Sequence, residues 1–418
     1  MRHIACDGPG RRDDGLDGGD ARSRGPPNRA ARRAWFKGSA AVLTLLWASY
    51  WLGLFAPLAV YVLYPLGVLF AARLRTSRDL VADLPWPSVT VAIAAHNEER
   101  DIGRVVASAL AQEYPGPPIE VLVGLDGCTD RTGDVLAAMG EPRLRWLDLE
   151  RAGKAATDNR LVAATTTDVV VTTAAGAVYD LGALHLLCDP FRDATVGCVS
   201  GVFVPRQDGS AAASGEGVYW RLEYGLMEAE SRLGILACAS GTSMAHRRSI
   251  FRPIPLDSDG DVAIAPNAVG QGYRTVFVRG AVVRDDGPRD LRAVLRNRRR
   301  MAIRALPTTA LSVARLARHG RWAAAFALAM HKLMRWLVPF CLPLWAGAAI
   351  GLTIAGDGTA AALTIALLLL GAGAALLAAA SGPGPRGTIA SFAVAQIAFA
   401  LATIDVVRGR RARMWSRQ

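Results

Sequence analysis

Cysteine is scarce in this 418-residue chain, and acidic residues are outnumbered by basic ones. The six cysteines are scattered, with no close pair at metal-binding spacing: Cys6, Cys128, Cys188, Cys198, Cys238 and Cys341. This spacing argues against a zinc site or a disulfide framework and fits a reducing cytoplasm. The chain has 36 aspartates and glutamates against 48 lysines and arginines, a net charge of +12. Such a charge suits an anionic membrane face or an anionic substrate.

Charge is absent from four long apolar runs, which are Gly38–Ala72, Trp336–Gly356, Thr359–Pro385 and Gly387–Ile404. A helix needs roughly 20 apolar residues to cross the hydrocarbon core of a bilayer, so the three C-terminal runs are long enough or nearly so. The first run, of about 35 residues, is too long for one untilted helix and tight for two. Because Pro57 and Pro65 interrupt it, one pass and two passes are both open.

These runs divide the chain into segments. Residues 1–34 are rich in Gly, Arg, Asp and Pro, and their few apolar side chains predict a disordered tail. Arginines 73, 75 and 78 mark a cytoplasmic boundary by the positive-inside tendency. The predicted segments are the tail 1–34, an N-terminal membrane segment 35–76, a soluble domain 85–306, an interfacial amphipathic region 307–335, about three membrane segments within 336–407 and a basic tail 408–418.

Two signals disagree about the C-terminus. Three C-terminal spans would place it on the side opposite the soluble domain. The tail contains four arginines, which prefer the cytoplasmic side: Arg408, Arg410, Arg411 and Arg413. Either one apolar segment lies at the membrane interface instead of spanning, or the short tail is tolerated outside.

The stretch from Ser88 to Arg131 is predicted to form a strand, a helix and a second strand. The β-rich run Val89–Ala95 ends at His96-Asn97-Glu98-Glu99, and apolar residues then recur at helical spacing. A second run, Ile119–Leu125, closes on Asp126-Gly127-Cys128-Thr129-Asp130. The carboxyl ends of parallel strands meet at one edge of a sheet, where ligands of open α/β sheets bind. Both polar turns are therefore expected to face one crevice.

These two turns, in this order and spacing, resemble those of the family 2 glycosyltransferases. The resemblance implies a GT-A fold, an α/β domain with a Rossmann-like, mostly parallel sheet, here flanked by transmembrane helices. It also implies a nucleotide-diphosphate sugar as donor, with UDP as the expected nucleotide. By the same resemblance, Asn97, Glu98, Asp126, Gly153 and Lys154 form the donor nucleotide site.

The chain departs from this family at the metal site. Relatives place Asp-x-Asp at the end of the strand that corresponds to Val169–Val171, and its carboxylates hold a divalent cation, Mg²⁺ or Mn²⁺, on the donor diphosphate. This chain has Thr173 and Ala175 at those positions. Neither side chain neutralises a hard cation as a carboxylate does. Asp168 lies before the strand and Asp180 well beyond its end, so neither is expected to be a metal ligand.

Asp261 is the expected catalytic base. It ends the acidic turn Asp257–Asp261, and counting back from Gly272-Tyr273-Arg274, a landmark in relatives, places it at the family's base position. Inverting transfer needs one carboxylate to take the proton of the acceptor hydroxyl. A calcium loop is excluded, because Val262 and Ala268 stand where the EF-hand requires Gly and Glu. A merely solvated acidic loop remains the alternative.

Eight arginines lie within residues 284–304. The run Arg298, Arg299 and Arg300 stands where processive relatives have Gln-x-x-Arg-Trp, and the Gln and Trp are missing here. By resemblance, these arginines and Gly241 belong to the acceptor and diphosphate side, where cations can stabilise a departing diphosphate. A role at the anionic membrane surface is comparably supported. Nucleic-acid binding is not expected, because no motif accompanies the charge.

The sequence is therefore interpreted as a membrane-anchored inverting glycosyltransferase. We expect a multi-pass protein of the cell membrane, with the catalytic domain in the cytoplasm and a role in the biosynthesis of cell-envelope polysaccharides. Its acceptor is expected to be a saccharide or a lipid-linked saccharide. The segment from His331 to Trp336 is predicted to be the interfacial entry to the first C-terminal span, with His331 in a structural role. The alternative is a catalytically degenerate homologue that acts as a membrane scaffold or as a partner subunit of an active synthase.

Overall fold

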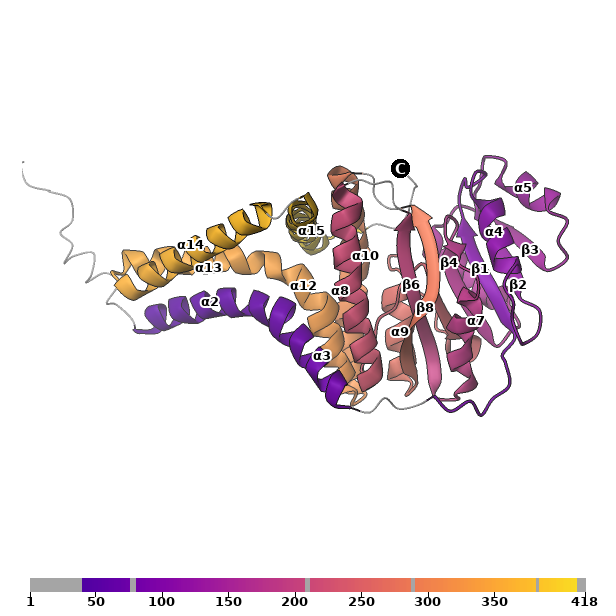
Figure 1. Ribbon diagram of the computed structural model, residues 1–418, viewed down its shortest axis with the longest axis horizontal. Helices are drawn as coiled ribbons and strands as arrows, with labels where there is room; N and C mark the ends of the chain where they lie inside the picture. The colour runs from indigo at the N-terminus through magenta and orange to yellow at the C-terminus, as the bar shows by residue number, and fades with distance from the viewer. Residues whose placement is uncertain (1–39, 76–79, 207–210, 287–289, 381–382, 412–418) are drawn as a thin grey trace, which may run out of the picture.

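The computed structural model describes residues 40–75, 80–206, 211–286, 290–380 and 383–411. The tail predicted over residues 1–34, and residues 412–418 of the predicted basic tail, lie outside the described residues. A sheet with its covering helices forms one end of the molecule, and a bundle of apolar helices projects from the other end (Figure 1).

An eight-stranded mixed sheet forms the centre of the domain, in the order β3-β2-β1-β4-β7-β6-β8-β5. Strands β3, β2, β1 and β4 pair in parallel, as do β6 and β8, whereas β7 is antiparallel to β4 and β6, and β5 to β8. The expected α/β fold with a mostly parallel sheet is therefore confirmed. The strands are β1 (Val89–Ala95), β2 (Glu120–Asp126), β3 (Leu144–Leu149), β4 (Val169–Ala174), β5 (Val178–Tyr179), β6 (Val196–Arg206), β7 (Met244–Arg247) and β8 (Arg274–Asp286).

Helices cover both faces of the parallel part of the sheet. Val91 and Ile93 of β1 pack with α4 (Ile102–Leu110), while Ala92 lies in a separate cluster with Leu161 of α6 (Lys154–Ala164). All residues of β1 are buried, as expected of a parallel strand covered on both sides. The other helical elements of the domain are α5 (Thr132–Ala138), α7 (Ala183–Cys188), η2 (Asp189–Arg192), α8 (Ala211–Leu233), η3 (Arg248–Ile250), α9 (Gly260–Gly270) and α10 (Leu291–Arg318).

The first apolar run forms one continuous helix of 35 residues, Ala40–Leu74. It consists of α2 (Ala40–Leu58), the π-helical turn η1 (Ala59–Leu63) and α3 (Tyr64–Leu74). The wider turn lies between Pro57 and Pro65, which remove N–H groups from the helical ladder. The helix is longer than one membrane pass requires because its C-terminal part packs on the domain. In that part, Tyr64, Val68 and Ala72 are buried against α8. The structure thus has one helix in this run, without the break that two passes would need.

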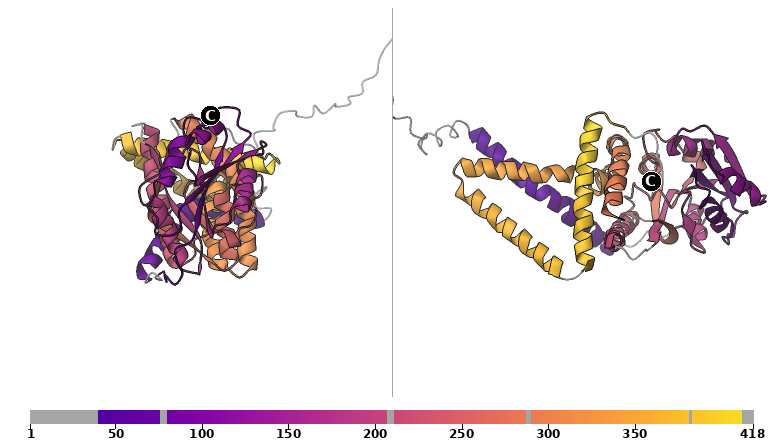
Figure 2. Two further views of the ribbon diagram at one scale, coloured as in Figure 1. Left: turned by 90° about the vertical axis from the view of Figure 1, so that its right-hand side faces the viewer. Right: turned by 90° about the horizontal axis from the view of Figure 1, so that it is seen from above.

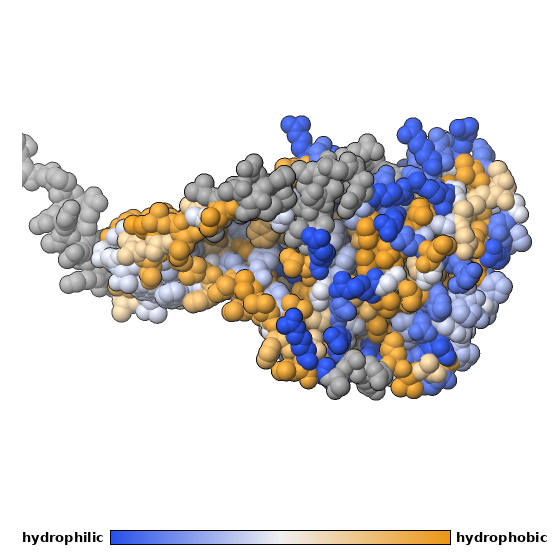
Figure 3. All heavy atoms as spheres, viewed as in Figure 1, coloured by the Kyte–Doolittle hydropathy of each residue, from blue (hydrophilic) through white to orange (hydrophobic). Residues whose placement is uncertain are grey.

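Two more helices among the described residues are long and apolar enough to cross a membrane, Trp322–Ile354 and Gly387–Val407. The first runs through α11 (Trp322–Leu328), η4 (Ala329–Leu333), α12 (Met334–Leu337), η5 (Val338–Phe340) and α13 (Cys341–Ile354), and the second belongs to α15 (Pro383–Val407). Helices α2 and α13 pack together in the projecting bundle, and α14 (Gly358–Ala380) begins beside the end of α13 and diverges from it (Figure 2). Helix α15 runs crosswise to them beside α8 and α10 (Figures 1 and 2). Apolar side chains dominate the visible surface of this bundle, and polar ones gather on the domain (Figure 3).

Helix α10 crosses the boundary that the sequence places at residue 306. Pro307 lies inside the helix, although proline removes one helical hydrogen bond. Residues on both sides of it are buried, namely Arg304, Ala305, Thr309 and Ser312, so packing holds the helix together through the proline. The predicted soluble and interfacial regions are therefore joined by one helix.

Gly201 marks a register shift in β6, between Ser200 and Val202. A β-carbon at this position would meet the Ser243 hydroxyl and lie 2.5 Å from the carbonyl oxygen of Ala281. We predict that Gly201→Ala lowers the free energy of unfolding by about 1–3 kcal/mol, because the backbone of the core must shift to admit the methyl group. Thermal unfolding of the detergent-solubilised protein measures this loss.

The control for this prediction is Gly225→Ala in α8, where a β-carbon would meet no atom within 4 Å. This variant should be as stable as the wild type or slightly more so, because alanine is the better helix former. Equal melting temperatures for Gly201→Ala and the wild type would contradict the packing described here.

Candidate active site

The polar turns after β1 and β2 are joined by the side chain of Asn97. Its backbone has a φ of 56°, which asparagine tolerates better than most residues do. Its Oδ1 accepts a hydrogen bond from the Thr129 N–H at 2.8 Å, and its Nδ2 donates to the Thr129 hydroxyl at 3.2 Å. Glu98 is buried, and its backbone N–H donates to the Thr132 hydroxyl at 2.9 Å. The two turns therefore lie side by side at one edge of the sheet.

Asp126 fastens the start of α6 to the end of β2. Its Oδ1 accepts hydrogen bonds from two backbone N–H groups, including that of Gly153 at 3.0 Å, where the positive end of the helix favours a carboxylate. Lys154 follows, with its Nζ 2.9 Å from the Asp158 carboxylate. His96 Nδ1 lies 2.8 Å from the Asp126 carbonyl oxygen. The structure thus brings both turns and the Gly-Lys segment together.

The end of β4 does not fit the divalent cation that the family implies. Thr173 is buried and donates its hydroxyl hydrogen to the Thr242 carbonyl oxygen at 2.9 Å. Ala175 is 2% exposed and packs in the apolar core. The neighbouring carboxylates have other partners. Asp168 accepts a hydrogen bond from the Ser88 hydroxyl before β1, and Asp180 forms a 2.8 Å ion pair with Arg284 of β8. Mg²⁺ and Mn²⁺ prefer sets of carboxylate oxygens, and these residues do not provide one.

Asp261 lies in the first turn of α9, close to the loop that contains Gly241. A β-carbon added to Gly241 would lie 3.7 Å from the carboxyl carbon of Asp261. The Asp261 Oδ1 atom is buried and has no hydrogen-bond partner among the described residues. Burial and the negative charge of Asp259 raise the pKa of Asp261 to about 6, against the lowering effect of Lys332. A carboxylate in this state is suited to accept a proton, unlike one in a solvated loop.

Arg304 holds the acidic turn that precedes Asp261. Its side chain is buried, its Nε donates to Asp259 Oδ1 at 2.7 Å, and its Nη2 donates to the Ser258 carbonyl oxygen. Arg304 was not predicted to be part of the site. Its position one helical turn after Arg300 is the signal that could have identified it.

The turn that carries Asp261 also packs on the apolar helices. Val262, the next residue, belongs to a buried cluster formed with α10, α12 and α15, whose other members are Ala302, Ala305, Trp336 and Ala402. Lys332 of η4 is close enough for its charge to lower the pKa of Asp261. The candidate site therefore lies at the junction between the domain and the candidate spans.

The arginine run on α10 does not form a single cluster. Arg299 Nε donates to Asp405 Oδ2 of α15 at 2.8 Å. Arg298 lies over the Trp220 ring, 5.7 Å from its centroid, and Arg300 is half-buried. Arg299 therefore braces the last apolar helix, through a partner so distant in the sequence that no local pattern reveals it.

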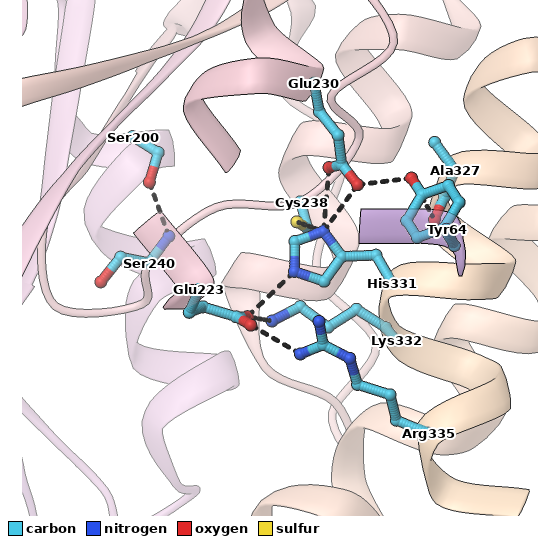
Figure 4. A network of polar contacts seen from close by, with 10 residues as sticks. All are labelled: Tyr64, Ser200, Glu223, Glu230, Cys238, Ser240, Ala327, His331, Lys332 and Arg335. Atoms are coloured by element: carbon cyan, nitrogen blue, oxygen red, sulfur yellow. Dashed lines mark hydrogen bonds and ion pairs between the residues drawn. The ribbon is translucent and has the colours of Figure 1, made fainter. Parts of the chain in front are cut away.

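Two glutamates of α8, Glu223 and Glu230, form the centre of a buried polar network at the same junction (Figure 4). Glu223 accepts hydrogen bonds from His331 Nε2 at 3.0 Å, Lys332 Nζ at 2.6 Å and Arg335 Nη1 at 2.6 Å. Burial alone would raise the pKa of Glu223, but these cationic neighbours hold it well below its usual range. Neither glutamate was predicted from the sequence, although their separation of two helical turns places them on one helix face.

A sheet of this order, with polar turns after β1 and β2 and a buried carboxylate at the start of α9, defines a GT-A sugar transferase fold. Residues 87–303 match the family described as Glycosyltransferase like family 2. This match covers more than half of the chain, and the chain belongs to this family.

The curated relatives are sugar transferases. The chain is 28% identical over 248 residues to an N-acetylglucosaminyltransferase of Azorhizobium caulinodans. The aligned region covers 54% of this chain and 62% of that protein. The chain is 34% identical over 92 residues to a beta-monoglucosyldiacylglycerol synthase of Synechocystis. That aligned region covers 21% of this chain and 19% of that protein. The chain therefore spans less than two thirds of the length of these relatives.

A solved structure confirms the fold. A mannosyltransferase from Pyrobaculum calidifontis, in complex with GDP-Man and Mn²⁺, superposes with a TM-score of 0.63 at 24% identity. The superposition covers 87% of this chain and 99% of that chain. The GT-A fold expected from the two polar turns is thus found together with the flanking apolar helices.

The raised pKa of Asp261 predicts an acid limb in the pH profile. We expect kcat/KM for sugar transfer to fall about tenfold per pH unit below a pKa of about 6, because a protonated carboxyl cannot accept a proton. Asp259→Asn keeps a residue that can cap α9 but removes a neighbouring negative charge, so it should move this limb to lower pH. A profile that stays flat below this pH, or a limb that Asp259→Asn does not move, would count against the assignment.

Proposed function

We propose that this protein is a membrane-bound glycosyltransferase that moves a sugar from a nucleotide-diphosphate sugar to a saccharide or lipid-linked acceptor with inversion. The observation that carries the proposal is the Asp261 carboxylate, whose buried Oδ1 has no partner among the described residues and lies near the Gly241 loop. Membership of the family supports sugar transfer as the reaction class.

A single displacement step accounts for inversion. Asp261 takes the proton of the acceptor hydroxyl while the hydroxyl oxygen forms a bond to the anomeric carbon of the donor sugar. The bond between the anomeric carbon and the diphosphate oxygen breaks, and the nucleoside diphosphate leaves with the electron pair. Because the acceptor attacks the face opposite the leaving group, the configuration at the anomeric carbon inverts.

The donor nucleotide is assigned to the edge of the sheet formed by Asn97, Glu98, Asp126, Gly153 and Lys154. Their hydrogen bonds hold two turns and the start of α6 in place, which supports a preformed nucleotide site. UDP is the nucleotide that the family resemblance favours, and the GDP-Man bound to the P. calidifontis enzyme makes GDP the competing choice. Since the end of β4 does not suit a divalent ion, we assign the neutralisation of the diphosphate to cations of this chain, Lys154 and the arginines of α10.

The acceptor is proposed to come from the bilayer. The turn that carries Asp261 packs through Val262 on Trp336 and Ala402, which belong to candidate membrane helices. An acceptor held in the membrane by a lipid would present its sugar at this junction without leaving the bilayer. Of the two acceptor classes, this arrangement favours the lipid-linked one.

We further propose that α2, α13 and α14 cross the cell membrane while α15 lies along its cytoplasmic surface. Helix α15 runs crosswise to the other three (Figure 2) and is tied to the domain by the ion pair between Asp405 and Arg299. The residue Arg411 beyond it pairs with Asp257 at 2.6 Å. This orientation keeps the basic tail on the side of the catalytic domain. With only two C-terminal spans, the C-terminus would lie in the cytoplasm, which the arginines of the tail prefer.

One observation favours a second function. Thr173 and Ala175 remove the carboxylates with which relatives hold a metal, as expected of a degenerate homologue that acts as a scaffold or as a partner subunit of an active synthase. The retained donor turns and the buried Asp261 support the enzyme instead.

Turnover of a donor panel separates the two functions. We predict that the purified protein releases nucleoside diphosphate from a UDP-sugar or GDP-sugar, and that Asp261→Asn lowers the rate by about 100-fold or more, because the base is lost. Asp257→Asn, which changes an acid of the same turn that pairs with Arg411, is the matched control and should keep most of the turnover.

The same assay, run without chelator, tests the role of metal. Added Mg²⁺ or Mn²⁺ should change the rate by less than about twofold, because the end of β4 offers no carboxylate pair. A strict requirement for added Mn²⁺ would overturn the assignment of the diphosphate to protein cations. If the wild type neither releases nor binds any nucleotide, the scaffold function replaces the enzyme.

The orientation of α15 can be tested by cysteine labelling in intact cells, in a variant that lacks Cys6, Cys128 and Cys341 and keeps the buried Cys188, Cys198 and Cys238. We predict that Gly358→Cys, at the start of α14, reacts with a membrane-impermeant maleimide from outside. A cysteine appended after Gln418 should react only after the cells are permeabilised, because α15 does not cross. Labelling of the appended cysteine in intact cells would show that α15 spans the membrane.

A further inference from the structure

Three potential metal ligands converge in the network of Figure 4. Glu230 comes from α8, Cys238 from the segment between α8 and β7, and His331 from the π-helical turn η4. Each of the three residues is 1% exposed. One ligand atom from each lies within 4.8 Å of the other two. The sequence argues against a zinc site because its cysteines form no close pair at metal-binding spacing. Only the fold brings these three residues together.

Three atoms with lone pairs lie around His331 Nδ1. Both carboxylate oxygens of Glu230 lie 2.9 Å from this nitrogen, and Cys238 Sγ lies 3.9 Å from it. In a tetrahedral zinc site, neighbouring N, O and S ligands are about 3.3–3.7 Å apart, given the usual metal–ligand distances. The distances from His331 Nδ1 to the Glu230 oxygens, 2.9 Å, are shorter than this range, and the distance to Cys238 Sγ, 3.9 Å, is longer.

The surrounding residues have the arrangement of a second coordination shell. His331 Nε2 lies 3.0 Å from Glu223 Oε1, the carboxylate contact that commonly fixes the tautomer of a metal-bound histidine. The Tyr64 hydroxyl donates to Glu230 Oε1 at 2.5 Å and lies 3.5 Å from the Ala327 carbonyl oxygen. The ligands are therefore oriented from outside, as in built metal sites.

We propose that Glu230, Cys238 and His331 bind a structural transition-metal ion of the Zn²⁺ type. A thiolate and an imidazole select a borderline-soft ion over Mg²⁺ or Mn²⁺. On binding, the ion replaces the proton of the Cys238 thiol and any proton on His331 Nδ1, and both protons pass to the solvent. The ion would clamp α8 to the helix Trp322–Ile354, and Tyr64 would extend the clamp to the helix Ala40–Leu74. This proposal does not depend on the function proposed above.

Metal analysis of the full-length protein tests the proposal. The protein is purified in detergent with a tag that contains no histidine and without chelator, and its metal content is measured by mass spectrometry. We expect close to one zinc per chain in the wild type and a loss of at least tenfold in Cys238→Ala. The matched control is Cys341→Ala, a half-buried cysteine outside the cluster, which should retain the metal.

Cobalt supplies a second readout, and its wild-type arm does not depend on the folding of any variant. Wild-type protein reconstituted with Co²⁺ should show a thiolate-to-cobalt charge-transfer band, which Cys238→Ala should lack. Wild-type protein that carries no zinc as purified and shows no such band after incubation with Co²⁺ would overturn the proposal and leave an ordinary hydrogen-bonded network. Zinc that remains in folded Cys238→Ala at the wild-type level would place the metal elsewhere and would equally refute it.

Discussion

The buried carboxylate of Glu223 holds the α/β domain to the candidate membrane helices. It is 2% exposed and is bonded to His331, Lys332 and Arg335, which all belong to the helix Trp322–Ile354. A buried charge is tolerated only when its partners are in place, and removing one partner of such a pair costs about 3–5 kcal/mol. The network therefore fixes the register between α8 and this helix.

The candidate active site depends on that register. Lys332 bonds to Glu223, and its charge also lowers the pKa of Asp261, the proposed base. Val262, directly after Asp261, packs on α10, α12 and α15. Arg304 of α10 holds the same turn through Asp259. Asp261 is thus positioned by contacts with the apolar helices, whereas the polar turns proposed to bind the donor are positioned by the sheet.

The arrangement of the two polar turns could be predicted because its signals are local. The strands of the first βαβ unit are apolar runs that end abruptly in polar turns, and the residues that link those turns, such as Asn97, lie within the turns themselves. That these turns bind the donor stays a prediction. The residues at the end of β4, Thr173 and Ala175, can be read from the sequence alone, and the structure buries both.

The contacts between the domain and the apolar helices could not be predicted, because they join residues about a hundred positions apart. His331 meets Glu230, and Arg299 meets Asp405, without any pattern linking their positions. Hydropathy identifies α15 as long and apolar enough to span a bilayer, but its crosswise direction is set by packing on α8 and α10. The continuity of α10 through Pro307 likewise reflects burial on both sides of the proline.

The most informative measurement is the structure of the protein in lipid nanodiscs, bound to an unreactive analogue of its donor. We predict that the anomeric carbon lies beside Asp261 at the bilayer surface and that the diphosphate contacts side-chain cations, with no divalent ion at Thr173 and Ala175. A diphosphate bound through a metal ion at the end of β4, or a donor whose anomeric carbon is remote from Asp261, would refute the proposed mechanism.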